Sequence, residues 1–211
     1  MLCYVNRKNV AYYLHMRRTA AGRTGYVMTR SSADALETAP PGMEIVENVN
    51  AQVSVRMRRK RIITAEEESL VRKALETLGL TDYRVEINNR TIVIYEPHFN
   101  RDEVMRRHDE LLKSDALISM AFLRVRAAVG GQRVEEYLAE KRQETLAALQ
   151  REQMYEPALQ FTLSSPSDRS FTVQRMGYSG AGGWRFVALV SLQEAVRAYL
   201  PTLGKMSFYE M

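Results

Sequence analysis

The chain has 211 residues and one cysteine, so it is long enough for a substantial hydrophobic core and cannot hold an internal disulfide. Apolar residues make up 45% and charged residues 26%, a composition typical of globular proteins and not of disordered ones. Its most apolar stretch, ALISMAFL, is too short to span a bilayer, and MLCYVNRKNVAYY lacks a signal-peptide pattern. We therefore expect a soluble cytoplasmic protein.

Alternating apolar residues predict strands near the N-terminus. Val10, Tyr12, Leu14 and Met16 are expected on one buried face of a strand, since successive side chains point to opposite faces. Further strands are predicted over residues 26–29, 43–47 and 52–57, which gives a four-stranded antiparallel sheet built from two hairpins. A short helical turn is expected over residues 33–38, stopped by the prolines that follow.

Residues 56–68, RMRRKRIITAEEE, combine a basic run with an acidic one. Thr64 and Glu67 have capping-box spacing, so a helix is predicted from Ala65, where the helix dipole favours the three glutamates in its first turn. An apolar stripe of helical period follows, and Gly79 ends it. Helix chemistry thus explains the acids but leaves the basic run at residues 58–61 unexplained.

A second hairpin is predicted over residues 83–95, with its turn at Asn88-Asn89. Asn100 with Glu103 predicts the start of a helix. Residues 115–129 are apolar nearly all round, which predicts a buried helix that could continue the preceding one. From Val134 to Met154 a polar helix carries a narrow stripe: Val134, Tyr137, Leu138, Thr145 and Leu149.

After Pro157 the pattern returns to strands and predicts a β-β-β-α module, with Ser191 and Glu194 capping the last helix. The predicted class is α+β, with antiparallel strand-rich N-terminal and C-terminal modules around a helical centre. The predicted domains are a basic β-rich module with one helix at residues 1–98, a helical segment at 99–155 and the β-β-β-α module at 156–211.

The stretch LETAPPGMEIVENVNAQVSVR and the closing YLPTLGKMSFYEM resemble a group of uncharacterised bacterial proteins with this layout. That group has no established activity, so the resemblance implies no site residues.

Three patterns in the sequence are candidate sites of chemistry. The loop GYSGAGGW nearly matches a nucleophile elbow around Ser179, but no histidine follows His108, and a strand follows where a phosphate cradle needs a helix. Asp102 and His108 are six residues apart, on opposite sides of a helix, which argues against a metal site with His98. Cys3 has no base beside it. The sequence therefore predicts no catalytic residue, no metal ligand set and no cofactor.

Residues 1–61 hold eleven Arg and Lys against four acids, whereas the rest of the chain is nearly balanced. This asymmetry favours an anionic partner at the N-terminal end. Arginines beside a tyrosine on a sheet suit a nucleic acid, which stacks on rings and needs charge for its phosphates. The predicted contact residues are Tyr13, His15, Arg17, Arg56, Arg58, Arg59, Lys60 and Arg61.

Structural readings of the same residues remain open: glutamates of the helix from Ala65 could pair with the arginines, or the cations could protect a strand edge. The sequence favours a non-catalytic binding protein for nucleic acid or another polyanion. The alternative is a protein-interaction or scaffold module that uses the helix at 132–154, with homodimerisation through it, and an enzyme of unidentified class comes third.

Overall fold

A computed structural model describes residues 1–18, 22–114, 124–131, 133–177 and 183–205. The chain divides into two compact units. The first contains Met1–Glu96 and Tyr155–Met211, and the second contains Pro97–Met154. The second unit is therefore an insertion within the chain of the first.

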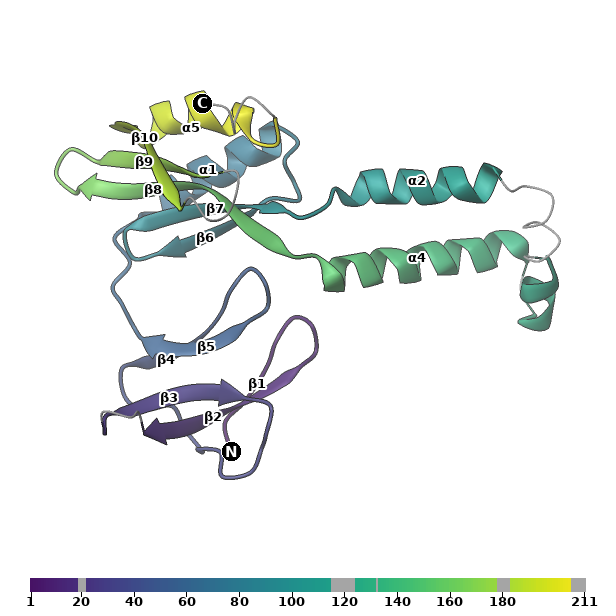
Figure 1. Ribbon diagram of the computed structural model, residues 1–211, viewed down its shortest axis with the longest axis horizontal. Helices are drawn as coiled ribbons and strands as arrows, with labels where there is room; N and C mark the ends of the chain where they lie inside the picture. Colours follow the sequence, from purple (N-terminus) through teal and green to yellow (C-terminus); the bar gives the residue numbers. More distant parts are fainter. Residues whose placement is uncertain (19–21, 115–123, 132, 178–182, 206–211) are drawn as a thin grey trace. The chain divides into compact units, whose positions relative to one another are not determined.

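The first unit contains a five-stranded antiparallel sheet in the order β10-β9-β8-β7-β6 (Figure 1). Its strands are β6 (Arg84–Asn88), β7 (Thr91–Pro97), β8 (Tyr155–Ser165), β9 (Ser170–Met176) and β10 (Trp184–Ser191). Each strand thus lies beside its neighbour in the chain, even though the 57 residues 98–154 separate β7 from β8. The Leu163 N–H donates to the Arg90 carbonyl at 2.8 Å across the β7–β8 pair. With the N-terminal sheets below, this confirms the α+β class.

Two helices cover one face of this sheet: α1 (Ala65–Thr77) and α5 (Leu192–Tyr199), which runs on into the short 3-10 turn η1 (Leu200–Thr202) (Figure 1). The core between them is apolar: Val71, Leu75, Ile92, Ile94, Leu159, Phe161, Leu163, Phe171, Val173, Leu192, Ala195 and Val196 are all buried. The capping boxes predicted for these two helices are confirmed, because Thr64 with Glu67 and Ser191 with Glu194 exchange their hydrogen bonds. Each helix therefore starts where its local sequence dictates.

Local details of the strand-rich regions also follow the sequence, with one shift. The β6–β7 turn is at Asn89-Arg90 rather than Asn88-Asn89, because Asn88 pairs with Thr91 and Asn89 takes the positive φ of 35°. The β-β-β-α order of the C-terminal region is confirmed, and Gly177 N–H donates to the Gly183 carbonyl at 3.2 Å where β9 and β10 meet. Ser179 lies outside the described residues.

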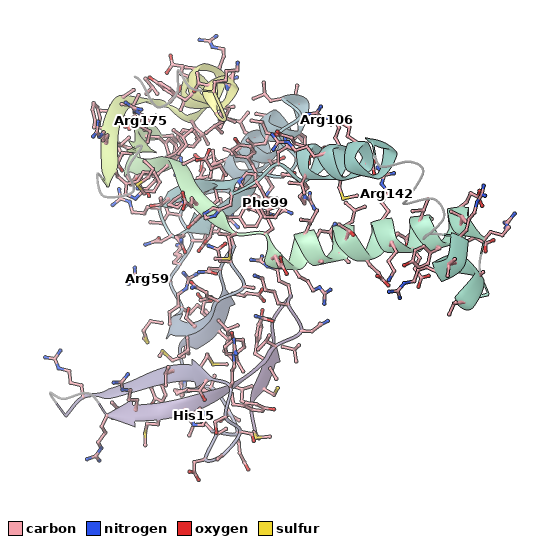
Figure 2. All side chains as sticks on the ribbon, turned by 45° about the vertical axis from the view of Figure 1, so that its right-hand side comes forward. His15, Arg59, Phe99, Arg106, Arg142 and Arg175 are labelled. Carbon is pink, nitrogen blue, oxygen red and sulfur yellow. The ribbon has the colours of Figure 1, made fainter. Side chains whose placement is uncertain are left out.

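The second unit contains α2 (Arg101–Ser114), a helical stretch at 124–129 and α4 (Val134–Glu152). Arg142 reaches from α4 to Asp109 on α2, with 3.1 Å between Nη2 and Oδ2 (Figure 2). At the other end of the helix pair, His98 N–H donates to the Met154 carbonyl at 2.9 Å. The helices predicted from Asn100 and Val134 are confirmed. The buried helix predicted over 115–129 falls mostly outside the described residues.

The N-terminal strands form two sheets, so the predicted four-stranded sheet is wrong. β1 (Cys3–Val5), β2 (Ala11–Arg18) and β3 (Thr24–Thr29) make one sheet, and β4 (Met43–Glu47) pairs with β5 (Val53–Met57) in another. The sequence prediction missed β1, which pairs with β2 on the side away from β3. Both hairpins were placed correctly, but alternation alone does not say which hairpins join.

Two further expectations for this region are wrong. Leu14 is fully buried as predicted, but Met16 on the same face is 59% exposed because it lies two residues from the end of β2, toward the loop that joins β2 to β3. Residues 33–38 form no helix. Instead, the Leu36 N–H donates to the Leu14 carbonyl and the Leu2 N–H donates to the Leu36 carbonyl, both at 2.8 Å, so the backbone groups of Leu36 bond to distant segments and not within a helix.

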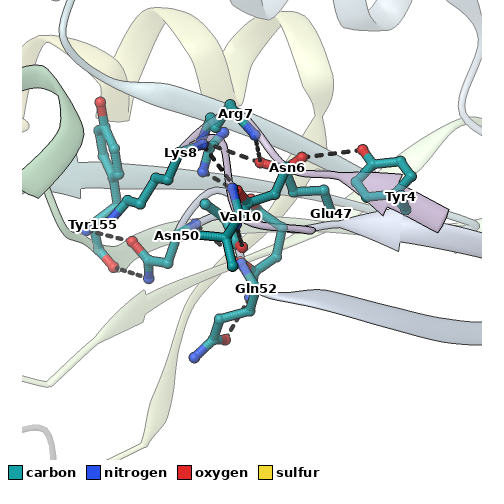
Figure 3. A network of polar contacts seen from close by, with 11 residues as sticks. Tyr4, Asn6, Arg7, Lys8, Val10, Glu47, Asn50, Gln52 and Tyr155 are labelled. Atoms are coloured by element: carbon teal, nitrogen blue, oxygen red, sulfur yellow. Dashed lines mark hydrogen bonds and ion pairs between the residues drawn. The ribbon is translucent and has the colours of Figure 1, made fainter. Parts of the chain in front are cut away.

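Asparagine side chains organise the N-terminal turns and attach them to the large sheet (Figure 3). Asn6 is buried; its Oδ1 accepts from the N–H groups of Lys8 and Val10, and its Nδ2 donates to the Ala51 carbonyl at 2.8 Å. Asn50 binds both backbone groups of Tyr155: Oδ1 accepts from the N–H at 2.8 Å and Nδ2 donates to the carbonyl at 2.9 Å. The Asn50 amide therefore pairs with the first residue of β8 as a neighbouring strand would.

We predict that Asn50→Ala lowers the free energy of unfolding by about 1–3 kcal/mol, since two partly buried hydrogen bonds are lost and the Tyr155 backbone is left unpaired. Urea unfolding measures this. Gln52→Ala is the matched control, because its side chain accepts an exposed hydrogen bond within the same turn. Equal stability of the two variants would contradict the assignment.

Candidate nucleic-acid interface

The eight predicted contact residues lie in three places. Tyr13, His15 and Arg17 are on one face of β2, and Arg56 is on β5. Residues 58–61 follow β5 as an extended, exposed segment. Because β2 and β5 belong to different sheets, the predicted residues do not form one sheet face.

The carboxyl ends of β2 and β5 nevertheless point to the same side of the N-terminal region (Figure 1). Arg17 and Arg18 end β2, and Arg58, Arg59 and Lys60 come directly after β5. Figure 2 shows Arg59 extending away from the ribbon. We call these five residues the basic end. Arg18 was missed from the sequence because the strand was expected to end at Met16, whereas β2 continues to Arg18 and its last residues are exposed.

Two of the predicted arginines have structural partners. Arg56 donates to Glu44 Oε1 at 3.0 Å and to Asn88 Oδ1 at 2.7 Å, which links β5 to β4 and β6. Arg61 pairs with Glu68 of α1 and donates to the Ile63 carbonyl at 3.1 Å. The helix glutamates thus pair with one end of the basic run, as the structural reading proposed.

The remaining cations of the run are available. Arg58 is 74% exposed and approaches Glu44 only at 4.0 Å. Within the part of the chain that the structure describes, the side chains of Arg59 and Lys60 make no hydrogen bond or ion pair. The same holds for Arg17 and Arg18. A polyanion could therefore bind four of these groups without breaking an existing ion pair, and Arg58 would give up only its long contact with Glu44.

Tyr13 and His15 differ from the exposed rings that stacking requires. Both are half-buried, and His15 Nε2 lies 2.9 Å from the Ser31 carbonyl oxygen. Flanking strands supply Cys3 and Val27 to the same face. This face is therefore mixed in character, and its charge is concentrated at Arg17.

A polar cleft of about 330 Å³ lies between β4, β5 and β6, lined in part by Glu47, Ser54, Arg56 and Glu86. Glu86 Oε1 accepts from Asn88 at 3.2 Å, and burial together with Glu86 raises the pKa of Tyr95 to about 12. Glu47 accepts from Tyr4 and Arg7. Glu47, Arg56 and Glu86 thus each have a partner within the protein, and of their side-chain atoms only Glu86 Oε2 is buried without a hydrogen bond among the described residues. The cleft indicates no particular ligand.

Among the described residues no three His, Cys, Asp or Glu side chains are close enough to hold a metal ion. Cys3 is exposed. No helix within those residues has the length and apolar character to cross a membrane. Comparison with protein families, with curated proteins and with solved structures gives no match.

The Arg61–Glu68 pair gives a pH-dependent prediction. Arg61 is the main cause of a lowered pKa at Glu68, and Arg72 adds to it. A lowered folded-state pKa stabilises the fold above the ordinary glutamate value of 4.5, and this stabilisation is lost as pH falls through the folded pKa.

We predict that Glu68→Gln loses less stability than the wild type between about pH 6 and about pH 3, as measured by urea unfolding. Glu76→Gln, an exposed change on the same helix, should leave the pH dependence as it is. An equal or steeper loss in Glu68→Gln would contradict the role of this pair.

Proposed function

We propose that this protein is a non-catalytic cytoplasmic binding protein for nucleic acid or another polyanion, and that the basic end makes the contact. The observation that carries the proposal is the set of five exposed, available cations at the carboxyl ends of β2 and β5. Phosphates neutralised by such side chains release bound counterions, which drives association. Arg56 and Arg61 flank these cations in the sequence and anchor the segment between β5 and α1, because Arg56 binds Asn88 and Arg61 pairs with Glu68.

The arrangement supports phosphate contact more strongly than base readout. Long side chains at strand ends can follow a flexible backbone, whereas the half-buried Tyr13 and His15 offer little ring surface for stacking. We therefore propose binding with low sequence preference and strong dependence on salt.

The test replaces Arg58, Arg59 and Lys60 together with glutamate. Binding to a fluorescent single-stranded oligonucleotide, measured by anisotropy, should weaken at least about 100-fold at low salt, and the slope of log K against log salt should fall by about 2, since roughly 0.7 arises per phosphate contact. The control carries the same charge change at Lys73, Arg124 and Lys205, which are also exposed. If both triple variants lose affinity equally, net charge alone explains binding, and if neither does, the proposal is wrong.

The second candidate is a protein-interaction module that uses residues 132–154. The observation that favours it is that α4, 19 residues long, has no buried side chain. Its predicted stripe, including Tyr137 and Leu138, is only half-buried. A helix of this composition is marginal alone, so a partner protein or a second copy would stabilise it.

Light scattering at micromolar concentration tests this alternative. We predict that an assembly held by α4 dissociates in Leu138→Glu, because the carboxylate would be buried at the contact without a partner. Gln143→Glu, on an exposed position of the same helix, is the control. A mass of one chain for the wild type would refute self-association through α4.

A further inference from the structure

β10 is an edge strand whose outer backbone groups have no strand partner among the described residues. The sheet ends at β10, which pairs with β9 along its inner edge. An unpaired strand edge presents a row of N–H and carbonyl groups that can pair with another strand. Proteins usually protect such edges with charged side chains, prolines or a covering segment.

The face of β10 that points away from α1 and α5 is apolar and exposed. Register with β9 places Trp184, Phe186 and Leu189 opposite Met176, Gln174 and Thr172, on the face away from the core. Phe186 is 67% exposed and Leu189 is 56% exposed. Exposed apolar residues grouped on one strand, rather than scattered, indicate an interaction surface.

This face is also uncharged. Where β8, β9 and β10 pair, it carries only neutral residues: Gln160, Thr162, Thr172, Gln174, Met176, Trp184, Phe186 and Leu189. The opposite edge of the sheet differs, because β6 carries Arg84 and Glu86 and its Asn88 binds Arg56 of β5. One edge is thus charged and joined to the N-terminal hairpin. The outer face of the other edge is neutral and apolar, and Arg185, the charged residue of β10, is on the opposite face.

We infer that β10 pairs antiparallel with β10 of a second copy of this chain and continues the sheet across a two-fold axis. Charge selects this occupant. Two copies of a chain with net charge +5 repel each other, so they can associate most easily where the surface is neutral. A polyanion would find no cation on this face, and a two-fold contact places the same patch on both sides.

The β-bulge in β10 fixes the register. Between Phe186 and Ala188 the pairing with β9 shifts by one residue, so outward-facing residues are even-numbered before the bulge and odd-numbered after it. In an antiparallel pair of β10 strands, the outward-facing residues of one copy must lie opposite those of the other on both sides of the bulge. This condition is met when Phe186 lies opposite Leu189 of the second copy. The axis then passes between Val187 and Ala188, and Arg185 lies opposite Val190. Two Phe–Leu cross-strand contacts and no like-charge contact result.

Light scattering at about 50 µM tests the pairing. The expected result is a mass of two chains for the wild type and of one chain for Phe186→Arg, with unchanged circular dichroism. Leu189→Lys is the second variant, in case Phe186→Arg does not fold. Leu138→Glu on α4 should keep the mass of two chains, and this separates β10 pairing from assembly through α4.

Cross-linking tests the register. In a Cys3→Ser background, a chain carrying both Phe186→Cys and Leu189→Cys should form covalent dimers under mild oxidation. The matched control places cysteines at Thr172 and Gln174, which are on the same face one strand away from the edge. A wild-type mass of one chain, a dimer that survives both charged β10 variants, or equal cross-linking in the control would each overturn the inference. None of these three outcomes affects the oligonucleotide measurements on the basic end, so the two proposals can fail separately.

Discussion

The pairing of β7 with β8 is the contact on which the first unit depends. The core contains side chains from β7, such as Ile92 and Ile94, and from β8, such as Phe161, and neither group can be buried until the two strands meet. A flexible connection of 57 residues would oppose this closure by about 4 kcal/mol of chain entropy. An antiparallel helix pair reduces that cost, because α2 leads the chain out and α4 leads it back, so that His98 and Met154 lie within hydrogen-bonding distance. The inserted unit thus acts as a structured turn of the β7–β8 hairpin.

The sequence predicts those features that are set within a few residues. Thr64 with Glu67 and Ser191 with Glu194 need only a spacing of three residues, and both caps are present. No comparable local pattern in the sequence shows which distant elements pair with each other. Alternation in β2 and β5 is compatible with one sheet or two, and nothing near Asn50 in the sequence indicates that its amide binds Tyr155, 105 residues away. Residues 33–38 show the same limit, because long-range bonds to Leu14 and Leu2 replaced the helix that local propensity favours.

The basic run illustrates how far a candidate site can be predicted. Composition locates the charge at residues 56–61, but it cannot separate arginines that support the fold from those that remain available. The separation depends on acids elsewhere in the chain: Glu44 lies across a hairpin from Arg56, and Glu68 is on a helix that begins after Arg61. Among the residues that the structure describes, Arg59 and Lys60 pair with no acid. The middle of the run is therefore the part whose charge the fold does not use.

This division has an energetic consequence for binding. An arginine held in an ion pair must give up its carboxylate before it can contact a phosphate, so part of the new interaction is offset by the loss of the old one. An available lysine or arginine loses only side-chain freedom, which is of the order of 2 kcal/mol at most. The basic end, which is charged, therefore suits an anionic partner, whereas the outer face of β8–β10, which is uncharged, suits a neutral and apolar one. In the functions that we propose, the first surface would attract polyanions over several ångströms and this attraction would weaken with salt. The second would gain free energy from burying apolar area and pairing backbone groups, which salt hardly affects. The two surfaces can bind their partners independently, because no residue of one belongs to the other.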